Sequence, residues 1–388
     1  MLAERLHRRS FLCAVATLGL TCAGCVLYAA TADEQAAEQA DEQADTWPMF
    51  RGDPAGSGVA RGKLPDQLEL AWTFSVERGG FESTAAIADG TVYAGCLDGN
   101  LYAIDLADGK KRWEFATELG FTASAAVRKG RVYIGDSDGT FYCIDAKTGK
   151  KVWDFTTEAE INSSANFYKD NVLFGSQEGI LHCLNAETGK KVWAYESQDM
   201  IQCSPTVIGD RAFVAGCDAR LHVVDLTVGK RAGDVDLGQP TLCTPSIRGK
   251  MAYVGTIGSE LLAVDWQQAK VVWKYEGRSE FRSSAAVTAE AVIVGSRDRQ
   301  LHALNIADGK LLWRFPTERM IDGSPVVVGG RVFFGSGDGF LYGLDLKTGK
   351  QVWRYEAGGG IVASPAVAAG RLVIGTDDGD LYCFGRKK

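Results

Sequence analysis

A unit of 40 residues that repeats along most of the chain is the feature that most constrains its fold. Tryptophans recur at this spacing at Trp113, Trp153, Trp193, Trp273, Trp313 and Trp353, with Gly233 at the one position that lacks a tryptophan, and Trp72 stands ahead of the first full unit. A serine or threonine opens each of eight units, at Thr84, Ser124, Ser164, Ser204, Thr244, Ser284, Ser324 and Ser364. A fixed period of about 40 to 45 residues is typical of β-propeller blades.

Each unit has the pattern of four short strands separated by turns. In the best-preserved unit, three apolar runs between Ser324 and Asp345 precede a fourth run around Trp353. The runs alternate with a period of two and are rich in Val, Ile, Tyr and Phe, which indicates strands and excludes a helical solenoid. The Asp-Gly pair at 338–339 suits a tight hairpin. The Thr-Gly-Lys turn at 348–350 lacks the earlier glycine and the following helix of a phosphate-binding loop.

The sequence therefore predicts an all-β fold: an eight-bladed β-propeller of four-stranded antiparallel blades over residues 47–388. The last unit, which Ser364 opens, ends before a tryptophan strand can form. We expect the N-terminal strand Leu70–Phe74 to supply this missing strand. Closure of the ring in this way removes a free sheet edge that would otherwise pair with other chains.

Residues 1–32 lack the repeat and have the pattern of an export signal. Arg8 and Arg9 precede a moderately apolar run from Phe11 to Ala30, which is the order of a basic region and a hydrophobic region. The pattern R-R-x-F-L is that of a twin-arginine signal, and an ordinary secretory signal is the alternative. Cleavage after Ala32, lipidation at Cys25 in a lipoprotein-like box, and retention as an uncleaved anchor of about 20 residues all stay open.

Residues 33–46 are predicted to be an acidic, low-complexity tether. Six carboxylates and no basic side chain fall between Asp33 and Asp45, and such a segment cannot bury enough apolar area to offset the entropy of ordering. The formal net charge of the whole chain is −7, which provides no electrostatic footprint for nucleic acid. We expect a monomeric propeller held at a distance from a membrane or from a cleavage point.

Cysteine and histidine show no spacing typical of a metal or catalytic site. One column of small buried positions holds three cysteines, where cysteine serves as a small hydrophobe: Cys143, Cys183 and Cys383. A column otherwise filled by tyrosine holds three histidines, which indicates packing: His182, His222 and His302. Cys203 and Cys243 share a further column in neighbouring units. These two either pair or line the axis as free thiols.

The unit S-P-x-V…G-x-V-Y/F-x-G-S-x-D-G-x-L-Y-x-L-D-x-x-T-G-K-x-x-W resembles the repeat of the pyrroloquinoline-quinone (PQQ)-type propeller family over residues 70–388. The stretch Trp47–Gly58 is similar to the lead-in strand of these proteins. The resemblance implies one of two kinds of member. Quinoprotein dehydrogenases hold the quinone and a calcium ion in the channel, and the alcohol-oxidising ones place a disulfide of adjacent cysteines over it. Non-catalytic members resemble BamB, a lipoprotein scaffold of the outer-membrane β-barrel assembly machinery.

This chain departs from the dehydrogenase pattern. It has no two adjacent cysteines, and its strict 40-residue spacing leaves no room for long insertions between blades. No base, nucleophile or ion-ligand set stands out. The resemblance therefore implies a non-enzymatic scaffold of the periplasm or cell envelope, without a cofactor or metal, that binds envelope proteins such as the outer-membrane assembly machinery. The alternative is a quinoprotein-like protein that binds PQQ with calcium, or another small ligand.

One column is more variable in chemistry than any core position and lies two residues before each opening Ser or Thr. Its members are Glu82, Thr122, Asn162, Gln202, Leu242, Arg282, Asp322 and Val362. The residue just before each of them is apolar in nearly every unit, so strand alternation turns this column toward the mouth of the axial channel. We predict that the polar members bind a partner, with Arg282 and Asp322 as the charged centre. A row of solvated rim residues is the alternative.

Overall fold

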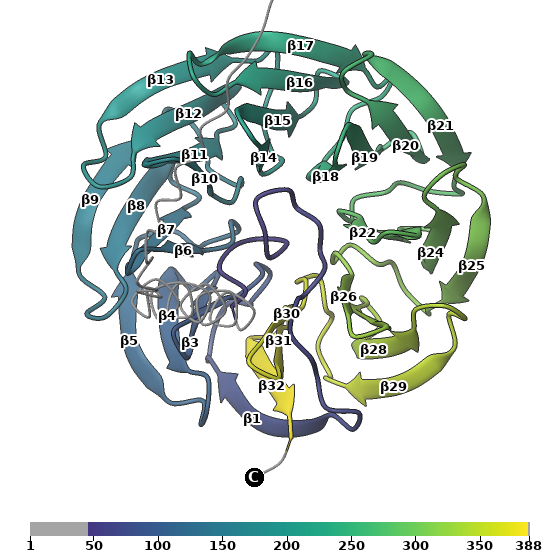
Figure 1. The fold of residues 1–388 in the computed structure, drawn as a ribbon. Coiled ribbons are helices and arrows are strands. Elements are labelled where there is room, and N and C mark those ends of the chain that lie inside the picture. Colours follow the sequence, from purple (N-terminus) through teal and green to yellow (C-terminus); the bar gives the residue numbers. More distant parts are fainter. Residues whose placement is uncertain (1–45, 387–388) are drawn as a thin grey trace, which may run out of the picture. The chain divides into compact units, whose positions relative to one another are not determined.

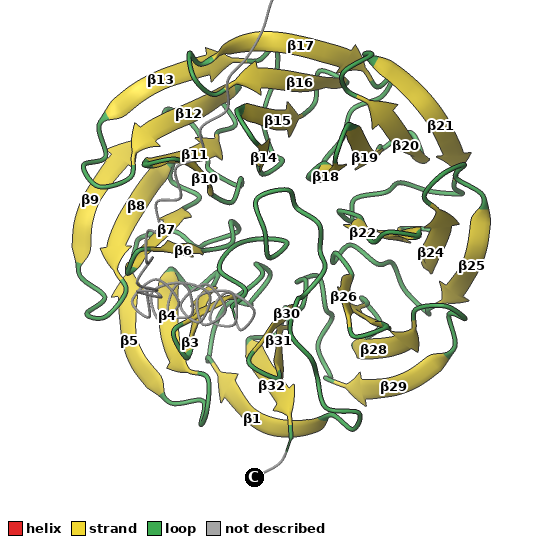
Figure 2. Ribbon diagram, in the orientation of Figure 1, coloured by secondary structure: helices red, strands yellow, loops and turns green. Residues whose placement is uncertain are grey.

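Each 40-residue unit folds into one four-stranded antiparallel sheet, and eight such sheets surround a central axis (Figure 1). This computed structural model describes residues 46–386. Figure 2 shows strands joined by loops and turns throughout this part of the chain, which confirms the predicted all-β, eight-bladed propeller. The sequence period of two is the reason, because every strand places alternate side chains on opposite faces of its blade.

The strands occupy four positions in each blade, from the axis outward. The innermost strands are β2 (Ala86–Ala88), β6 (Ala126–Arg128), β10 (Asn166–Tyr168), β14 (Thr206–Ile208), β18 (Ser246–Arg248), β22 (Ala286–Val287), β26 (Val326–Val328) and β30 (Ala366–Ala368). The second strands are β3 (Thr91–Gly95), β7 (Arg131–Gly135), β11 (Asn171–Gly175), β15 (Arg211–Ala215), β19 (Met251–Gly255), β23 (Ala291–Ser296), β27 (Arg331–Gly335) and β31 (Arg371–Gly375).

The third and outermost positions complete the blades. The third strands are β4 (Asn100–Asp105), β8 (Thr140–Asp145), β12 (Ile180–Asn185), β16 (Arg220–Asp225), β20 (Glu260–Asp265), β24 (Gln300–Asn305), β28 (Phe340–Asp345) and β32 (Asp380–Gly385). The outermost strands are β5 (Lys111–Ala116), β9 (Lys151–Thr156), β13 (Lys191–Glu196), β17 (Lys230–Asp236), β21 (Lys270–Glu276), β25 (Leu311–Pro316), β29 (Gln351–Glu356) and β1 (Glu69–Ser75).

The predicted closure of the ring is confirmed. Strand β1 pairs antiparallel with β32, with Trp72 opposite Cys383, so one blade joins the two ends of the described chain. The Trp353 indole of the preceding blade donates to the Leu68 carbonyl just ahead of β1, at 3.0 Å. Both ends of the propeller are therefore held by the same hydrogen-bonding pattern that joins the other blades.

Two contacts to the next blade recur among the seven blade tryptophans, and five of the seven make both. Six indole Nε1 groups donate to a carbonyl of the next blade at 2.9–3.1 Å: those of Trp72, Trp113, Trp153, Trp273, Trp313 and Trp353. The ring also lies over the glycine of the next blade's last turn. A Cβ added to Gly149 would lie 2.7 Å from the Trp113 ring, and Gly189 has the same relation to Trp153. The turn glycine is thus required by the close approach of the indole as well as by its positive φ.

The blade without a tryptophan shows how this contact is replaced. Gly233 occupies the tryptophan position, and the facing turn has Ala269 where the other turns have glycine. Trp266 from that turn instead packs against Phe213, with ring centroids 5.1 Å apart, and donates to the Gly249 carbonyl at 3.0 Å. At this interface the aromatic ring therefore comes from the neighbouring blade that follows Gly233. Packing thus explains why these two units depart from the repeat at Gly233 and Ala269.

The segment from Trp47 to Ala60, named here the plug, fills part of the axial channel. Figure 1 shows it in dark purple, looping through the centre of the ring. Six of the eight innermost strands donate one backbone N–H to its carbonyls, at 2.7–2.9 Å: those of Ile87, Val127, Val207, Ile247, Val287 and Val327. It forms only isolated bridges at Trp47 and Val59, so the lead-in is a looped insert and not a continuous strand.

The predicted export signal with Arg8 and Arg9, the lipidation site at Cys25 and the acidic tether up to Asp45 lie outside the described residues. Within the part of the chain that the structure describes, no helix is long and apolar enough to cross a membrane.

Replacement of a blade tryptophan tests the interface. We expect Trp153→Ala to lower the free energy of unfolding by about 3 kcal/mol, because it removes a large packed ring. It also removes the 3.1 Å hydrogen bond to Ala186. The denaturant midpoint measures the loss. Val152→Ala is the matched control, since this neighbouring side chain is 43% exposed. Equal midpoints for the two variants would contradict the role given to the indole.

Candidate functional site

The predicted channel-mouth column gathers around one cavity on the axis. This axial cavity of about 180 Å³ is lined by all eight members of the column and by the eight opening Ser and Thr residues, with Phe50 of the plug also in its lining. Seven of the apolar residues that precede the column are fully buried: Phe81, Phe121, Ile161, Ile201, Phe281, Ile321 and Ile361. Alternation along the chain therefore places the column as the sequence predicts.

A ring of hydroxyl groups surrounds the axial cavity. The backbone N–H of Thr84 donates to the Ser124 hydroxyl of the next blade at 3.0 Å, and that of Ser124 donates to Ser164 at 2.9 Å. The same bond, at 2.9 Å, joins each following pair up to Ser364. This network explains the strict Ser/Thr column, because only a hydroxyl at that position accepts the N–H of the preceding blade.

The two residues predicted as the charged centre, Arg282 and Asp322, both line the axial cavity. Arg282 donates to Glu280 of its own loop at 2.6 Å. Asp322 accepts two hydrogen bonds from Arg297, each at 2.9 Å. Each side chain has a partner of its own, so Arg282 and Asp322 do not pair across the mouth. Sequence spacing could not reveal this, because the partners lie outside the column.

The other polar members of the mouth are uncharged or partly desolvated. The Thr122 hydroxyl donates to the side-chain Oδ1 of Asn162 at 2.7 Å and links two neighbouring blades. Partial burial raises the pKa of the Glu82 carboxyl, and the nearby Asp377 carboxylate raises it further. A carboxyl with a raised pKa holds its proton more readily than a free carboxyl does.

Arg51 of the plug is the feature that sequence reasoning missed. Its side chain is 1% exposed, and its Nη2 donates to the Ala285 carbonyl at 3.0 Å. Burial lowers the pKa of its guanidinium to about 9. Its φ of 65° is in the left-handed region, which is uncommon for a residue other than glycine. The closely spaced Gly52, Gly56 and Gly58 were the available signal, because such glycines indicate a backbone packed tightly against another surface.

The cysteines of the mouth are free thiols. Cys203 and Cys243 are both buried and form no disulfide, which decides between the two alternatives left by the sequence. Burial raises the pKa of both thiols, so they stay protonated. The three cysteines of the other column are likewise free and buried, at Cys143, Cys183 and Cys383.

The histidine column has a structural role. Nε2 of His182, His222 and His302 lies 2.6–3.2 Å from the carboxylate of the turn that begins each third strand. Tyrosines of the same column make the equivalent bond, as Tyr102 does to Asp98 at 2.6 Å. His222 and His302 also place Nδ1 at 2.9 and 3.1 Å from a tyrosine hydroxyl of the preceding blade. Packing and turn support therefore account for these residues.

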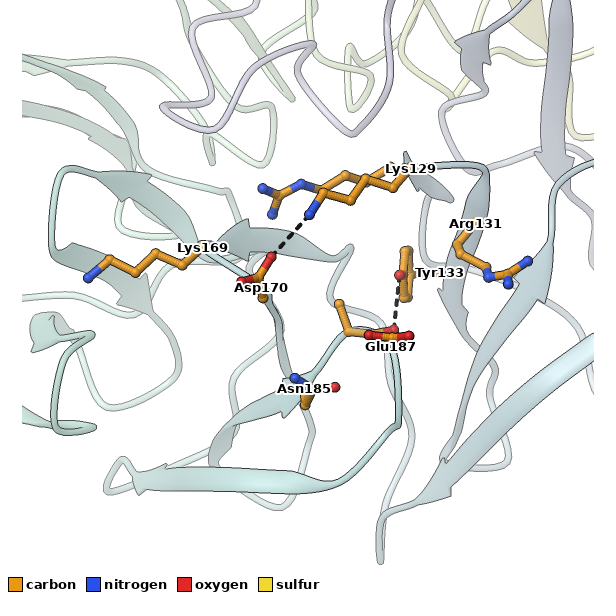
Figure 3. A pocket seen from close by; sticks show the side chains of 9 residues that line it. Lys129, Arg131, Tyr133, Lys169, Asp170, Asn185 and Glu187 are labelled. Carbon is orange, nitrogen blue, oxygen red and sulfur yellow. Dashed lines mark hydrogen bonds and ion pairs between the residues drawn. The ribbon is translucent and has the colours of Figure 1, made fainter.

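A second pocket, of about 250 Å³, lies between two blades on the face opposite the mouth (Figure 3). Lys129 reaches across it to Asp170 at 3.0 Å, as Figure 3 shows. Arg131 pairs with Asp145, and Arg128 stacks over the Phe167 ring at 5.1 Å. Most of the basic groups are thus occupied by partners from the protein itself.

Across residues 46–386, no group of three or more His, Cys, Asp or Glu side chains is placed to hold a metal ion.

The repeat, its hydroxyl ring and its tryptophan contacts define a PQQ-type β-propeller. The family model described as outer membrane protein assembly factor BamB matches residues 65–200, 143–293 and 177–387. The chain therefore belongs to this family. No curated protein matches it.

Solved structures share the fold at low sequence identity. BamB from Moraxella catarrhalis has a TM-score of 0.70 and 20% identity, covering 83% of this chain and 98% of that one. Quinohemoprotein alcohol dehydrogenase from Comamonas testosteroni has a TM-score of 0.76 and 17% identity, covering 89% and 81%. A europium-containing methanol dehydrogenase has a TM-score of 0.74 and 14% identity, covering 88% and 98%. These likenesses extend to BamB and to dehydrogenases alike, so they establish the fold alone.

The residues of the axial cavity do not fit PQQ with calcium. The quinone carries three carboxylates, but the lining offers one basic side chain, Arg282, which Glu280 already neutralises. Calcium takes six to eight oxygen ligands, typically with several carboxylates among them. The two lining carboxylates are Glu82 and Asp322, and Asp322 is paired with Arg297. The volume of about 180 Å³ is also below the roughly 300 Å³ at which small-molecule pockets begin.

A missing tyrosine provides a test of the histidine column. Nδ1 of His182 has no hydrogen-bond partner, because Phe155 stands where Tyr195 and Tyr275 face the other two histidines. We expect Phe155→Tyr to raise the free energy of unfolding by about 1 kcal/mol, the value of one buried hydrogen bond. Thermal and denaturant unfolding measure the gain. Phe115→Tyr is the control, since it faces Tyr142 and gains no acceptor; an equal gain there would refute the explanation.

The same histidine predicts a pH dependence. Burial lowers the pKa of His182 below its ordinary value of 6.5. The unfolded chain therefore binds the proton first, and stability present above about pH 6.5 is lost as the pH falls toward the folded-state pKa. His182→Tyr, which installs the residue found at Tyr142 and Tyr342, should show a smaller decline in unfolding midpoint between pH 7 and 5. Identical declines for the two proteins would show that His182 does not contribute.

Proposed function

We propose that this protein is a non-enzymatic scaffold of the cell envelope that binds partner proteins through its mouth face. The mouth face is the surface formed by the loops between blades and by the turns that join second and third strands. The family description, outer membrane protein assembly factor, supports this role. The outer-membrane β-barrel assembly machinery is accordingly the first partner to test.

Exposed apolar side chains around the polar mouth carry the proposal. Of the thirteen large ones exposed among the described residues, five lie on the mouth face and are 37–46% exposed: Leu97, Leu119, Met200, Ile257 and Met320. They surround an axial mouth that is polar. Protein interfaces are enriched in methionine and in apolar contacts interspersed with hydrogen-bonding groups. A surface of this composition suits a protein partner better than a small polar substrate.

The mouth face is also held in place before binding. The Leu97 N–H donates to the Gly80 carbonyl at 3.0 Å, and the Gly337 N–H donates to the Met320 carbonyl at 3.0 Å, so turns of one blade are tied to loops of the neighbouring blade. The same bond recurs at Ser137, Gln177, Ile257, Arg297 and Asp377. Loops fixed in this way lose little entropy on association, which favours affinity.

The family match and the N-terminal pattern support an exported location. We propose that the protein is periplasmic or envelope-associated, with a lipid at Cys25 or an uncleaved signal as its membrane tether. The intact mass of the mature protein distinguishes lipidation at Cys25 from cleavage after Ala32. Small-ligand binding is the second candidate, because the hydroxyl ring gives the axial cavity a built, polar lining. Saturable binding of a small polar ligand to the purified protein would support that candidate.

The scaffold proposal predicts partner loss on one face only. We expect Leu119→Asp combined with Met320→Asp to reduce crosslinked recovery of outer-membrane β-barrel proteins or their assembly machinery at least ten-fold, because charge in the apolar part of an interface is costly. Val228→Asp is the matched control: Val228 is 55% exposed in a turn on the opposite face. Unchanged recovery in the double variant, or equal loss in the control, contradicts the proposal. Arg282→Ala and Asp322→Ala then test the mouth column itself.

A further inference from the structure

Seven of the eight blades carry a lysine where the turn between the third and fourth strands ends. These ring lysines are all exposed: Lys110, Lys150, Lys190, Lys230, Lys270, Lys310 and Lys350. Lys110 and Lys310 pair with Asp108 and Asp308, each at 2.8 Å. The ammonium groups of the other five have no ion pair or hydrogen bond within residues 46–386. The turn uses only the backbone of this residue, as in the bond from the Asp105 N–H to the Lys110 carbonyl, so the fold does not explain the choice of lysine.

The closing blade has basic groups on the same face, although its outermost strand β1 has no ring lysine before it. A pocket beside the turn at Ala369 and Gly370 is lined by Lys63, Arg371 and Arg386, and no carboxylate contributes to its lining. The face opposite the mouth is named here the basal face. It is formed by the turns that join first to second strands and third to fourth strands. Basic side chains are therefore present on the basal face at all eight blades.

The mouth face carries the opposite charge at the equivalent place. Gly258 marks the one turn between second and third strands without a carboxylate at this position, and the other seven turns each hold one: Asp98, Asp138, Glu178, Asp218, Asp298, Asp338 and Asp378. The repeat thus places a carboxylate at one end of nearly every blade and a lysine at the other. An anionic surface is attracted to the basal face and repelled by the mouth face.

Exposed apolar side chains lie beside the ring lysines. The other eight of the thirteen large exposed apolar residues lie in the turn before an outermost strand or among the first three residues of such a strand: Leu70, Val152, Val192, Val228, Val272, Leu311, Leu312 and Val352. The register of the ladder shifts here, so that Val152, between Lys151 and Trp153, opposes no residue of the third strand. A bulge of this kind at a sheet edge re-aims its side chain. An apolar band therefore follows the ring lysines, roughly 7 Å further along each strand.

We propose that the basal face binds the surface of an anionic lipid bilayer. The ring lysines meet the headgroup phosphates, and the apolar band lies at the boundary between headgroups and acyl chains. Lysines together with apolar side chains on one face are the combination that binds proteins to the plane of a membrane. Each lysine close to an anionic lipid surface strengthens binding about five-fold. The mouth face then points away from the lipid and stays open to a protein partner.

The course of the chain supports this orientation. Trp47 pairs antiparallel with Ile87 of β2, and β2 leads into the basal turn at Asp89 and Gly90. The described chain therefore begins at the basal face. Cys25, the proposed lipid site, precedes Trp47 by about 20 residues, which span at most about 70 Å when extended. A basic face adds a second contact to such an anchor. This part of the argument rests on the envelope location proposed above.

The test is partition of the protein, purified from the envelope, into vesicles of phosphatidylcholine with and without phosphatidylglycerol, measured by co-sedimentation. The ratio of the two partition coefficients removes the contribution of a lipid or signal anchor. We expect the wild type to prefer the anionic vesicles. The triple variant Lys150→Gln, Lys190→Gln and Lys350→Gln should lower the ratio about 100-fold, because each lysine contributes about five-fold.

A matched control removes the same charge from the mouth face. Arg78, Arg278 and Arg319 are exposed there, and their joint replacement by glutamine should leave the ratio unchanged. Equal partition of the wild type into both kinds of vesicle, an unchanged ratio in the lysine variant, or an equal loss in the arginine control would overturn the proposal. Sedimentation without vesicles that the lysine variant alone prevents would also overturn it, because the basal face would then bind the acidic mouth face of another copy.

A second comparison tests the apolar band. Leu312→Ser combined with Val352→Ser should lower partition into the anionic vesicles about five-fold, because two apolar side chains no longer leave water on binding. Leu119→Ser combined with Met320→Ser, on the mouth face, should not change it. The same partition for both variants would contradict the place given to the band. The lysine variant should keep its recovery of the protein partner in detergent, so the failure of this proposal leaves the scaffold proposal standing.

Discussion

At five of the eight interfaces between blades, an indole ring lies over a turn glycine of the next blade and donates to a carbonyl there. The contact needs a tryptophan on an outermost strand. In the next blade it needs a glycine, which has no Cβ, under the ring and a backbone carbonyl within hydrogen-bond distance of the indole. The Ser/Thr ring makes a parallel set of contacts near the axis. Two sets of bonds therefore join the blades, the indole contacts at the outermost strands and the Ser/Thr contacts near the axis. The short loops of the mouth face connect strands that these bonds hold in place.

The blade of Gly233 shows that the physical requirement is an aromatic ring at the interface, not a tryptophan at one position. Trp266 enters the gap from the opposite side, and the facing turn no longer needs glycine, so Ala269 is tolerated there. Three departures from the repeat, at Gly233, Trp266 and Ala269, thus have one cause. A column-by-column comparison treats them as unrelated drift, because the compensating residue lies in a different column and a different blade.

The axial cavity derives its character from the plug as well as from the blades. Backbone carbonyls of the plug satisfy N–H groups of six innermost strands, which would otherwise face an open channel. The plug contributes Phe50 to the lining of the cavity and carries the buried guanidinium of Arg51. The cavity, at about 180 Å³, is smaller than the pockets that usually hold a large cofactor.

The sequence by itself determined the all-β class, the eight blades, the closing strand and the column of residues at the mouth. The 40-residue period and the alternation of side chains can be recognised from spacing along the sequence. They predict the fold because every blade places equivalent residues in the same environment. Only the tertiary structure decided that Arg282 and Asp322 have separate partners, that Cys203 and Cys243 are free thiols, and that Arg51 is buried at the axis. These facts depend on contacts between residues up to 234 positions apart in the chain, as in the bond from Arg51 to Ala285, and no spacing along the sequence encodes such distances.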